Sequence, residues 1–478
     1  MQAGLIISIS GLRGIVGENL TALVAADYGR AFGTFLKNSK LKIPQGMTCA
    51  TQNPARDGLR HSKLISVCIG RDSRSSGPML TAAVAEGLCG VGIEVIDVGL
   101  VPTPTVGVMV THLGCAGGVV ITASHNPIQY NGIKLLLGNA VAPPVDAAAR
   151  IKQCFIDKRF DLVDSERCGG MIFNEQADAT HIKKVLAIVD KKAIAARGFK
   201  VVLDSVNGAG GGITKKLLAA LGCRVSAIND EPTGLFAHAP EPLAENLTGL
   251  CAAVNSEGAE IGFAQDPDAD RLAIVDEAGT YIGEEYTLAL AAKHIFSKRV
   301  GKAATNLSTS RMIDDVARKA GCEVIRTPVG EANVAAAMLE HNCVIGGEGN
   351  GGVIDLRVSP IRDSLVGIAL ILQLMAETGK SVSDLVAEIG GYYMTKTKFA
   401  ADADQAERIL ERAKATFGEA RLNMSDGYRF DFPDGSWVHC RASNTEPVMR
   451  VIVEAKDQAT VQRHIDNMQN IRTTARIH

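Results

Sequence analysis

The sequence predicts an α/β protein built from several sheet-and-helix units. Short apolar segments rich in Val, Ile and Leu alternate with helical segments along most of the chain, which is typical of mostly parallel sheets covered by helices on both faces. Of the 478 residues, 46% are hydrophobic but only 4% are aromatic, so the cores must be aliphatic. At roughly 150 residues per domain, this length predicts about three domains.

Charge and cysteine content narrow the class of protein. A formal net charge of −2 at pH 7 disfavours a nucleic acid or an acidic membrane surface as the main partner. No apolar run approaches the ~18 residues that a membrane span needs. The N-terminal stretch has no basic residue before its apolar run, so no signal peptide is expected. The 11 cysteines are scattered without a CxxC pair, which indicates free thiols in a reducing cytoplasm rather than disulfides or a zinc site.

The first part of the chain is expected to alternate strands with helices. Segments 4–10, 65–69, 93–98 and 118–122 are apolar and β-branched, and segments 20–37 and 78–89 are predicted as helices. The polar stretch 38–62 is interpreted as a surface insertion without chemistry. Three local features are also expected: a loop from Gly11 to Gly14, a helix cap at Ser76, and a turn at Pro102 and Pro104.

A charged, turn-rich segment near residues 160–175 marks a boundary. Two further α/β units are expected after it. From about residue 390 strands cluster and helices are set apart, as in a smaller α+β domain. The expected strands are 201–204, 225–228, 303–307, 323–327, 343–345, 392–399, 428–432, 437–441 and 448–455, and the expected helices are 213–221, 285–297, 310–320, 365–377, 404–416 and one from 459.

The stretch VVITASHNPIQYNGIK, residues 119–134, carries the first candidate for chemistry. Its apolar start predicts a buried strand, which small polar residues and Pro127 interrupt. A serine at the carboxyl end of a buried strand faces the crevice where open α/β sheets bind their ligands. Ser124 is therefore a candidate nucleophile, although Ser124 and Asn126 could also serve only in an Asx or Ser turn.

The glycine-rich stretch from Val206 to Gly212 suggests a dinucleotide-binding loop. A GxGxxG fingerprint that begins at Gly208 needs glycine at position 213, where the chain has Ile213. The fingerprint fails, and a nicotinamide cofactor is disfavoured.

Asp266, Asp268 and Asp270 alternate in the segment QDPDADR. Crowded carboxylates raise one another's pKa unless a cation neutralises them. Oxygen ligands without His or Cys favour Mg²⁺ or Ca²⁺ over zinc. An EF-hand is the nearest rival because Glu277 falls at its twelfth position, but the sixth position holds Arg271 instead of glycine. We favour a Mg²⁺ site with a phosphate as co-ligand, and a solvated acidic turn is the alternative.

Two further polar loops complete the candidates. The loop GEGNGG offers the carboxylate of Glu348 and the amide of Asn350 to sugar hydroxyls, and a plain glycine-rich bend is an equal alternative. The loop RASNTEP combines a guanidinium, two hydroxyls and an amide, which suit a phosphate group, although taken alone it is an ordinary polar turn. Its candidate residues are Arg441, Ser443, Asn444 and Thr445.

The motifs TASHNPIQYNGIK, DPDADR, GEGNGG and RASNTEP occur in this order, with SGLRG near the start. Together they resemble the motifs of the α-D-phosphohexomutase superfamily, which includes phosphoglucomutase, phosphomannomutase and phosphoglucosamine mutase. The resemblance covers essentially the whole chain. It implies four domains around a central cleft: three related α/β domains with mixed sheets over residues 1–165, 166–277 and 278–389, and a smaller α+β domain over residues 390–478.

The resemblance also implies an isomerase that moves a phosphoryl group between the 1- and 6-positions of a hexose phosphate. Phosphorylated Ser124 would donate the group, and its phosphate and the three aspartates would bind Mg²⁺. Hexose 1,6-bisphosphate would be the activator. Lys134 is the favoured proton-transfer group, and His125 and Arg13 match positions near the phosphoserine. Arg271 follows the metal loop and is assigned, with the residues of the two polar loops, to substrate binding.

The chain departs from the usual superfamily pattern in three loops, and in the phosphate loop Asn444 stands where a glycine is usual. In the sugar loop, Asn350 takes a serine place and Gly352 a histidine place, so the acid/base role falls more heavily on Lys134. In the metal loop, Pro267 and Ala269 stand where glycines are usual. Glucose or mannose phosphates are the favoured substrates and glucosamine phosphate is the alternative. A Mg²⁺-dependent sugar phosphatase and a non-catalytic sugar-phosphate binder rank lower, and a monomer or a homodimer is expected.

Overall fold

The computed structural model describes residues 4–8, 11–39, 65–443 and 447–475. The chain divides into two compact units. The first contains Met1–Thr287 and Gly351–Val382, and the second contains Leu288–Asn350 and Ser383–His478. The insertion predicted at residues 38–62 lies outside the described residues from position 40 onward.

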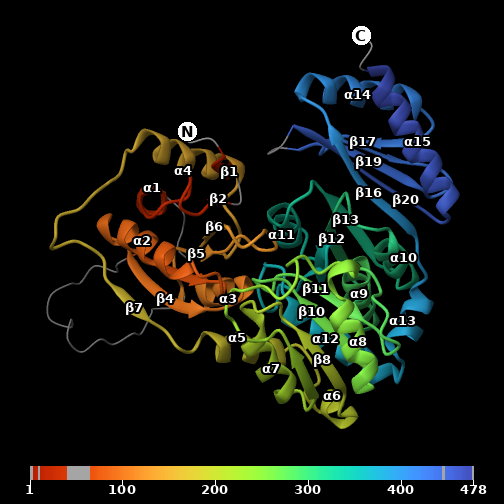
Figure 1. Ribbon diagram of the computed structural model, residues 1–478, viewed down its shortest axis with the longest axis horizontal. Coiled ribbons are helices and arrows are strands. Elements are labelled where there is room, and N and C mark those ends of the chain that lie inside the picture. The colour runs from red at the N-terminus through yellow and green to blue at the C-terminus, as the bar shows by residue number, and fades with distance from the viewer. Residues whose placement is uncertain (1–3, 9–10, 40–64, 444–446, 476–478) are drawn as a thin grey trace. The chain divides into compact units, whose positions relative to one another are not determined.

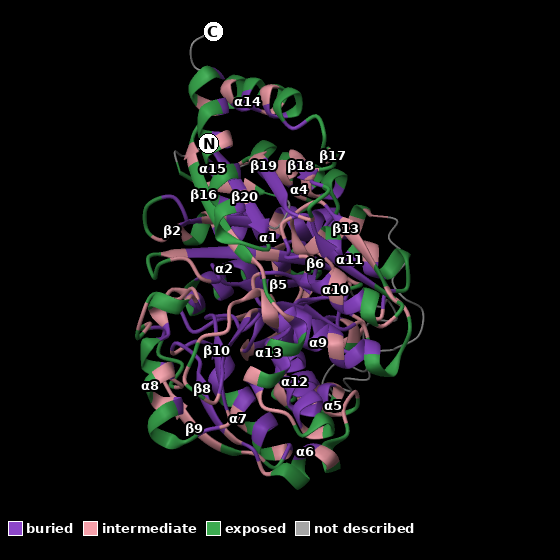
Figure 2. Cartoon of the chain, turned by 90° about the vertical axis from the view of Figure 1, so that its right-hand side faces the viewer, coloured by how far each residue is buried: buried purple, intermediate pink, exposed green. Residues whose placement is uncertain are grey.

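A mixed seven-stranded sheet opens the first unit, in the order β1-β2-β6-β5-β3-β4-β7. Strand β3 pairs in parallel with β4 and β5, whereas β6 runs antiparallel to β5 and β2. Every residue of β5 is buried, and Figure 2 marks the buried parts of the chain in purple. The strands are β1 (Ile6–Ser8), β2 (Gly11–Ile15), β3 (Ser66–Arg71), β4 (Glu94–Leu100), β5 (Gly117–Ile121), β6 (Tyr130–Leu137) and β7 (Met171–Phe173).

Helices cover both faces of this sheet. Because successive strand residues point to opposite faces, Val119 joins the core beneath α1 (Ala22–Asn38), α2 (Gly77–Gly90) and α4 (Val145–Asp157). Its neighbour Val120 joins the other core, with residues of α3 (Thr103–Leu113) (Figure 1). Burial on both faces explains the continuous aliphatic runs in the sequence.

Two local expectations from the sequence are wrong, and a third holds only in part. Gly11 to Gly14 do not form a loop but most of β2, and their glycines hid the strand pattern. Pro102 and Pro104 begin helix α3, where a proline loses no helical hydrogen bond because first-turn amides have no partner. Ser76 does occupy the N-cap position of α2, but its side chain makes no capping hydrogen bond, and its Oγ accepts from Asn131 Nδ2 at 2.9 Å.

A four-stranded sheet also belongs to the first unit, in the order β11-β10-β8-β9. Strand β8 pairs in parallel with β9 and β10, and β10 turns back into antiparallel β11. The turn between β10 and β11 therefore lies at the carboxyl end of the parallel strands. The elements are β8 (Lys200–Asp204), β9 (Arg224–Ile228), β10 (Ile261–Gln265), β11 (Leu272–Val275), α5 (Ala177–Leu186), α6 (Lys191–Arg197), α7 (Gly210–Ala220), the 3₁₀ helix η1 (Ala244–Asn246), α8 (Thr248–Glu257), β15 (Gly352–Ile354) and α12 (Ser364–Thr378).

The second unit contains a parallel core and an antiparallel sheet. Strand β12 pairs in parallel with β13 and β14. The antiparallel sheet has the order β16-β20-β19-β18-β17, and its buried residues share a core with α14 and α15. The elements are β12 (Lys302–Asn306), α10 (Met312–Lys319), β13 (Glu323–Thr327), α11 (Glu331–Glu340), β14 (Ile345–Glu348), β16 (Tyr393–Ala400), α14 (Ala403–Thr416), β17 (Arg421–Asn423), β18 (Tyr428–Asp431), β19 (Trp437–Ala442), β20 (Val448–Ala455) and α15 (Gln458–Ala475).

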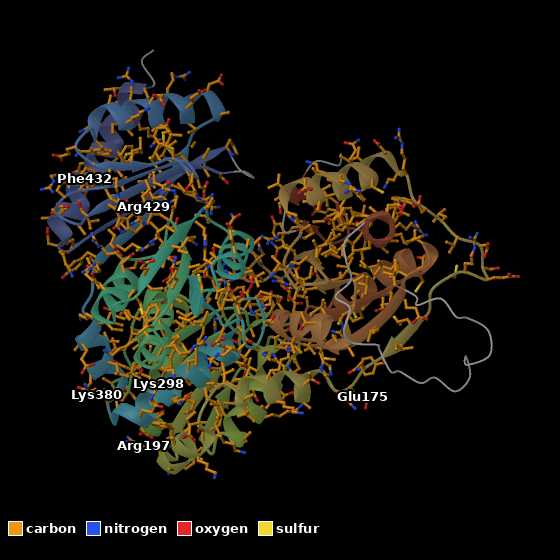
Figure 3. The ribbon with its side chains drawn as sticks, turned by 180° about the vertical axis from the view of Figure 1, so that it is seen from behind. Glu175, Arg197, Lys298, Lys380, Arg429 and Phe432 are labelled. Atoms are coloured by element: carbon orange, nitrogen blue, oxygen red, sulfur yellow. The ribbon has the colours of Figure 1, made fainter. Side chains whose placement is uncertain are left out.

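A buried arginine joins the two parts of the second unit. Arg429 on β18, labelled in Figure 3, lies 4.1 Å from the centre of the Trp437 ring and donates to the carbonyl oxygen of Leu307, directly after β12. The remaining helices are α9 (Glu285–Lys298) and α13 (Val382–Ile389). Among the described residues no single helix is long and apolar enough to cross a membrane, and only α12 with α13, as a bent pair, meets the length and composition test.

Close packing of α1 on α2 requires glycine at position 87. A Cβ on Gly87 would lie 2.1 Å from the carbonyl oxygen of Ala26, whereas a Cβ on Gly90 would meet no described atom within 4 Å. We expect G87A to lower the free energy of unfolding by about 1–3 kcal/mol because the helices must separate. G90A, the matched control, should be neutral or raise it by up to about 1 kcal/mol because Ala is the better helix former. Equal effects of the two variants in urea unfolding would contradict this packing.

Candidate active site

Ser124 lies in the loop that follows β5, at the carboxyl end of a central buried strand. Its φ angle of 50° is left-handed, an uncommon conformation for a residue with a side chain. The backbone amide of Ser124 donates to Thr122 Oγ1 at 2.9 Å, and that hydroxyl donates to Asp72 Oδ2 at 2.6 Å. These bonds fix the turn so that the serine is 4% exposed.

The three aspartates lie in the turn between β10 and β11 and are fully or almost fully buried. Asp266 closes this turn because its Oδ1 accepts from the backbone amides of Asp270 and Arg271, both at 3.1 Å. One carboxylate oxygen of each of Asp266, Asp268 and Asp270 lies within 4.8 Å of the others. The alternating spacing in the sequence therefore does bring the three carboxylates together.

The serine and the aspartates meet directly. Ser124 Oγ donates to Asp266 Oδ2 at 2.8 Å, although the two residues are 142 positions apart in the chain. This contact joins the carboxyl end of the first sheet to that of the second, which is where parallel sheets place reactive groups.

Cationic side chains partly neutralise the aspartates. Lys134 Nζ lies 2.7 Å from Asp268 Oδ2 and 3.6 Å from Asp270 Oδ2. Arg362 Nη2 lies 2.6 Å from Asp270 Oδ2. Thr103 Oγ1, at the start of α3, adds a hydrogen bond of 2.6 Å to Asp268 Oδ2. These contacts use the Oδ2 atoms of the two aspartates, and Arg271 Nε lies 4.0 Å from Asp270 Oδ1.

The donor set fits a small divalent cation. The buried atoms Asp268 Oδ1 and Asp270 Oδ1 have no hydrogen-bond partner among the described residues. Burial, and then the charges of Asp268 and Asp270, raise the pKa of Asp266 well above its ordinary value. Burial also acts to raise the pKa of Asp268, but the charge and hydrogen bond of Lys134 bring it below its ordinary value. Carboxylate oxygens without nitrogen or sulfur ligands are the set that Mg²⁺ prefers.

His125 and Arg13 both belong to this cluster. The Nδ1 atom of His125 lies 3.2 Å from Ser124 Oγ. Burial, and then the positive charges of Arg271 and Arg13, lower the pKa of His125 to about 3, so the imidazole is neutral at physiological pH. Arg13 lies on β2, and burial lowers its pKa while the charge of Asp268 acts to raise it.

Arg271 directly follows the three aspartates and pairs with Glu241, a residue not predicted from the sequence. Its Nη1 lies 3.2 Å from Glu241 Oε1, and the same oxygen lies 3.9 Å from His125 Nε2. Glu241 thus holds Arg271 beside His125.

The sugar-recognition candidates lie in the second unit, at the carboxyl ends of β12, β13 and β14. Glu348 Oε1 accepts from Asn306 Nδ2 at 2.7 Å and from the backbone amide of Gly330 at 3.2 Å. Buried Asn350 Oδ1 has no hydrogen-bond partner among the described residues, so it can accept one from a ligand. The end of β12 and the loop after β13 therefore hold the carboxylate of Glu348 in place.

The phosphate-loop candidates belong to the same unit. Arg441 at the end of β19 lies 3.9 Å from Asp426 Oδ2, which also accepts from the backbone amide of Val329 at 2.9 Å. Burial lowers the pKa of Arg441, while the charges of Asp426 and Glu348 act to raise it. The backbone amide of Ser443 donates to Val448, and the predicted Asn444 and Thr445 lie outside the described residues.

Comparison with known proteins identifies the family. Patterns that define four domains of the phosphoglucomutase/phosphomannomutase family match the chain in order: α/β/α domain I at residues 53–161, domain II at 179–279, domain III at 284–392 and the C-terminal domain at 394–471. The chain belongs to the phosphoglucomutase/phosphomannomutase family. It is therefore a phosphomutase, an enzyme of the isomerase class, and the predicted architecture of three α/β domains and a C-terminal domain is confirmed.

Relatives of full length support this assignment. A protein of Thermococcus kodakarensis named phosphoglucomutase/phosphomannomutase is 38% identical over 459 residues, which are 95% of this chain and 96% of the relative. A protein of Methanopyrus kandleri named "Probable phosphoglucosamine mutase" is 35% identical over 453 residues, 94% and 93% of the two chains. The crystal structure of a family member from Burkholderia thailandensis superposes with a TM-score of 0.83 at 28% identity and covers 98% of both chains.

Several residues at the candidate site of this phosphomutase were not predicted from the sequence, and only one segment among them carries a local signal. The segment GRDSR spans the last two residues of β3 and the loop after it up to Arg74, and it could have been recognised as a site loop. Thr103, Glu241 and Arg362 lie in ordinary polar segments, and only the folded chain brings them to the aspartates and Arg271.

The loop that carries Glu241 is anchored by a charged histidine. His238 Nδ1 lies 2.9 Å from the carbonyl oxygen of Ala239, and Nε2 lies 3.2 Å from Oδ2 of buried Asp204. Both acceptors require a hydrogen on the ring, so the imidazolium is the bound form. The hydrogen bond with Asp204 is the main cause that raises the pKa of His238.

This anchor predicts a pH-dependent stability. The pKa of His238 is raised in the folded state. Its contribution to the free energy of unfolding is therefore fully present below the pKa of the unfolded chain, about 6.5, and is lost as the pH rises through the pKa of the folded protein. The difference in unfolding free energy between the parent protein and H238Q should be larger near about pH 6 than near about pH 9. Urea unfolding at the two pH values measures this difference. A difference that grows with pH would refute the stabilising role of the His238–Asp204 contact.

Proposed function

We propose that this phosphomutase exchanges a phosphoryl group between Ser124 and the 1- and 6-hydroxyls of a hexose phosphate. The observation that supports the proposal is the buried contact of 2.8 Å between Ser124 Oγ and Asp266, beside three clustered carboxylates. In the first half-reaction the P–Oγ bond of phosphorylated Ser124 breaks and a P–O bond to a sugar hydroxyl forms. The second half-reaction returns the other phosphate of the bisphosphorylated sugar to Ser124.

In this proposal, neighbouring side chains transfer the proton and stabilise the negative charge. Lys134 is the proton-transfer group between the sugar hydroxyl and the serine oxygen, since no histidine stands at position 352. Arg13 and Arg271 supply positive charge for the transferring group, and His125, neutral at physiological pH, orients Ser124 Oγ through its ring nitrogen. Fixed charges that stabilise the spreading negative charge provide most of the catalysis in phosphoryl transfer.

Asp266, Asp268 and Asp270, together with the phosphate on Ser124, would hold Mg²⁺. When bound, this ion supplies electrostatic stabilisation of the phosphoryl oxygens. The orphaned oxygens of Asp268 and Asp270 support the assignment because buried carboxylate oxygens otherwise require a partner.

Substrate binding is assigned to the remaining candidates. Glu348 and Asn350 recognise sugar hydroxyls, and Arg441, Ser443, Asn444 and Thr445 hold the phosphate that does not react. Glucose and mannose phosphates are the proposed substrates, since the relative from Thermococcus kodakarensis is named for both. Glucosamine phosphate is the second candidate because the relative from Methanopyrus kandleri is named for it. Hexose 1,6-bisphosphate is the proposed activator, since it phosphorylates Ser124.

Three further features belong to the proposal. The domains span residues 1–165, 166–277, 278–389 and 390–478. The enzyme is a monomer or a homodimer. It works in the cytoplasm, which agrees with the free thiols of all cysteines in the described part of the chain.

Replacement of the proposed nucleophile gives the first test. S124A should lower the rate of glucose 1-phosphate isomerisation by about 10³-fold or more because no group remains to carry the phosphate. S256A, on the exposed surface of α8, is the control and should keep the parent rate. Substantial isomerisation by S124A would refute the assignment, and release of free phosphate by the parent enzyme at the rate of sugar phosphate loss would indicate a phosphatase.

Metal binding gives an independent test. D270N should weaken Mg²⁺ binding by about tenfold or more because an amide replaces a charged oxygen ligand. Isothermal titration of the purified protein with MgCl₂ measures the dissociation constant. D164N, which changes an exposed partner of Arg167, is the control. Equal affinity in D270N and D164N would exclude Asp270 as a ligand.

A further inference from the structure

Arg74 is a buried arginine next to the reactive loop that the proposed mechanism does not use. It lies three residues beyond the end of β3 and is 0% exposed. A buried guanidinium is costly unless its donors and its charge are satisfied. Its partners therefore indicate what this side chain holds in place.

The guanidinium uses every N–H it has. The Nε atom donates to Asp72 Oδ2 at 3.1 Å. Nη1 donates to the carbonyl oxygens of Pro127 and Tyr130 at 2.8 and 2.9 Å, and Nη2 donates to those of Ser124 and Asn126 at 2.5 and 2.7 Å. An arginine carries five such donors in a fixed plane, and a lysine carries only three around a point charge.

All four carbonyl acceptors lie between residues 124 and 130, in the loop that presents Ser124 and in the first residue of β6. The loop therefore wraps around one cation, with its backbone oxygens turned inward. Asp72 extends this arrangement, since its Oδ2 also accepts from Thr122 Oγ1, which accepts from the amide of Ser124. Arg74 and Asp72 thus fix the carbonyl and the amide of Ser124 at the same time.

We propose that Arg74, with Asp72 and Thr122, is the positioning device that holds Ser124 in its left-handed conformation and so directs Oγ at Asp266. The inference rests on the proposed role of Ser124 as phosphoryl carrier. A left-handed φ at a serine is disfavoured and persists only where its surroundings fix it. The direction of Oγ matters because a displacement of about 1 Å can cost about 100-fold in rate.

Thr122 offers the sharpest test because valine has nearly the same shape but neither donates to Asp72 nor accepts from Ser124. We expect T122V to lower kcat for glucose 1-phosphate by about tenfold or more while KM changes by less than about threefold, since only the reacting oxygen moves. T122S keeps the hydroxyl and should restore most of kcat. A T122V enzyme with the parent kcat would overturn the proposal, even if its melting temperature were lower.

Arg74 is tested by the change to lysine. R30K is the matched control, because Arg30 on α1 pairs with Asp27 and Glu86. R74K should lose about 100-fold in kcat at a temperature where its circular dichroism is that of the parent, because three donors cannot hold four carbonyls. A folded R74K with the parent kcat would overturn the proposal. If R74K does not fold, T122V and T122S decide the question.

The test separates this inference from the proposed function. Incubation of the parent enzyme with glucose 1,6-bisphosphate, followed by mass spectrometry, shows whether Ser124 takes up a phosphoryl group. No uptake at Ser124 refutes the proposed function itself. Uptake at Ser124, combined with the parent kcat in T122V and R74K, refutes only the positioning role.

Discussion

The hydrogen bond between Ser124 Oγ and Asp266 is the interaction on which the rest of the site depends. It requires two sheets to bring their carboxyl ends together, a left-handed serine on one side and a closed carboxylate turn on the other. Each side is supported by buried polar groups that would be costly without partners. Two sheets of the first unit thus place one hydroxyl against one acidic turn.

Electrostatics explain why so many charged groups tolerate burial here. Lys134 and Arg362 pair with Asp268 and Asp270, and the two orphaned carboxylate oxygens leave room for a divalent ion. In the second unit, Arg441 lies near Asp426 and Glu348 in the same way. Each of these cationic side chains thus has a carboxylate close by, which offsets part of the cost of burying its charge.

Much of this could be predicted from the sequence because the signals are local. Alternation of strands and helices, aliphatic cores and the alternating aspartates are short-range patterns. The strand at Gly11–Ile15 and the helix that begins at Thr103 were not predicted. Glycine occurs in both loops and strands, and proline occurs in both turns and the first turn of a helix, so contacts with the rest of the fold decide between them. Glu241 and Arg362 could not be found because nothing in their neighbours distinguishes them, and tertiary contacts alone bring them to the site.

The central claim is that Ser124 carries the phosphoryl group during turnover. The most direct measurement is peptide mapping of enzyme quenched while it isomerises a hexose phosphate labelled in its phosphate group. The account predicts that the label appears on the peptide with Ser124 and is lost again when unlabelled substrate is added. Label on a different residue, or steady turnover without any label on Ser124, would contradict it.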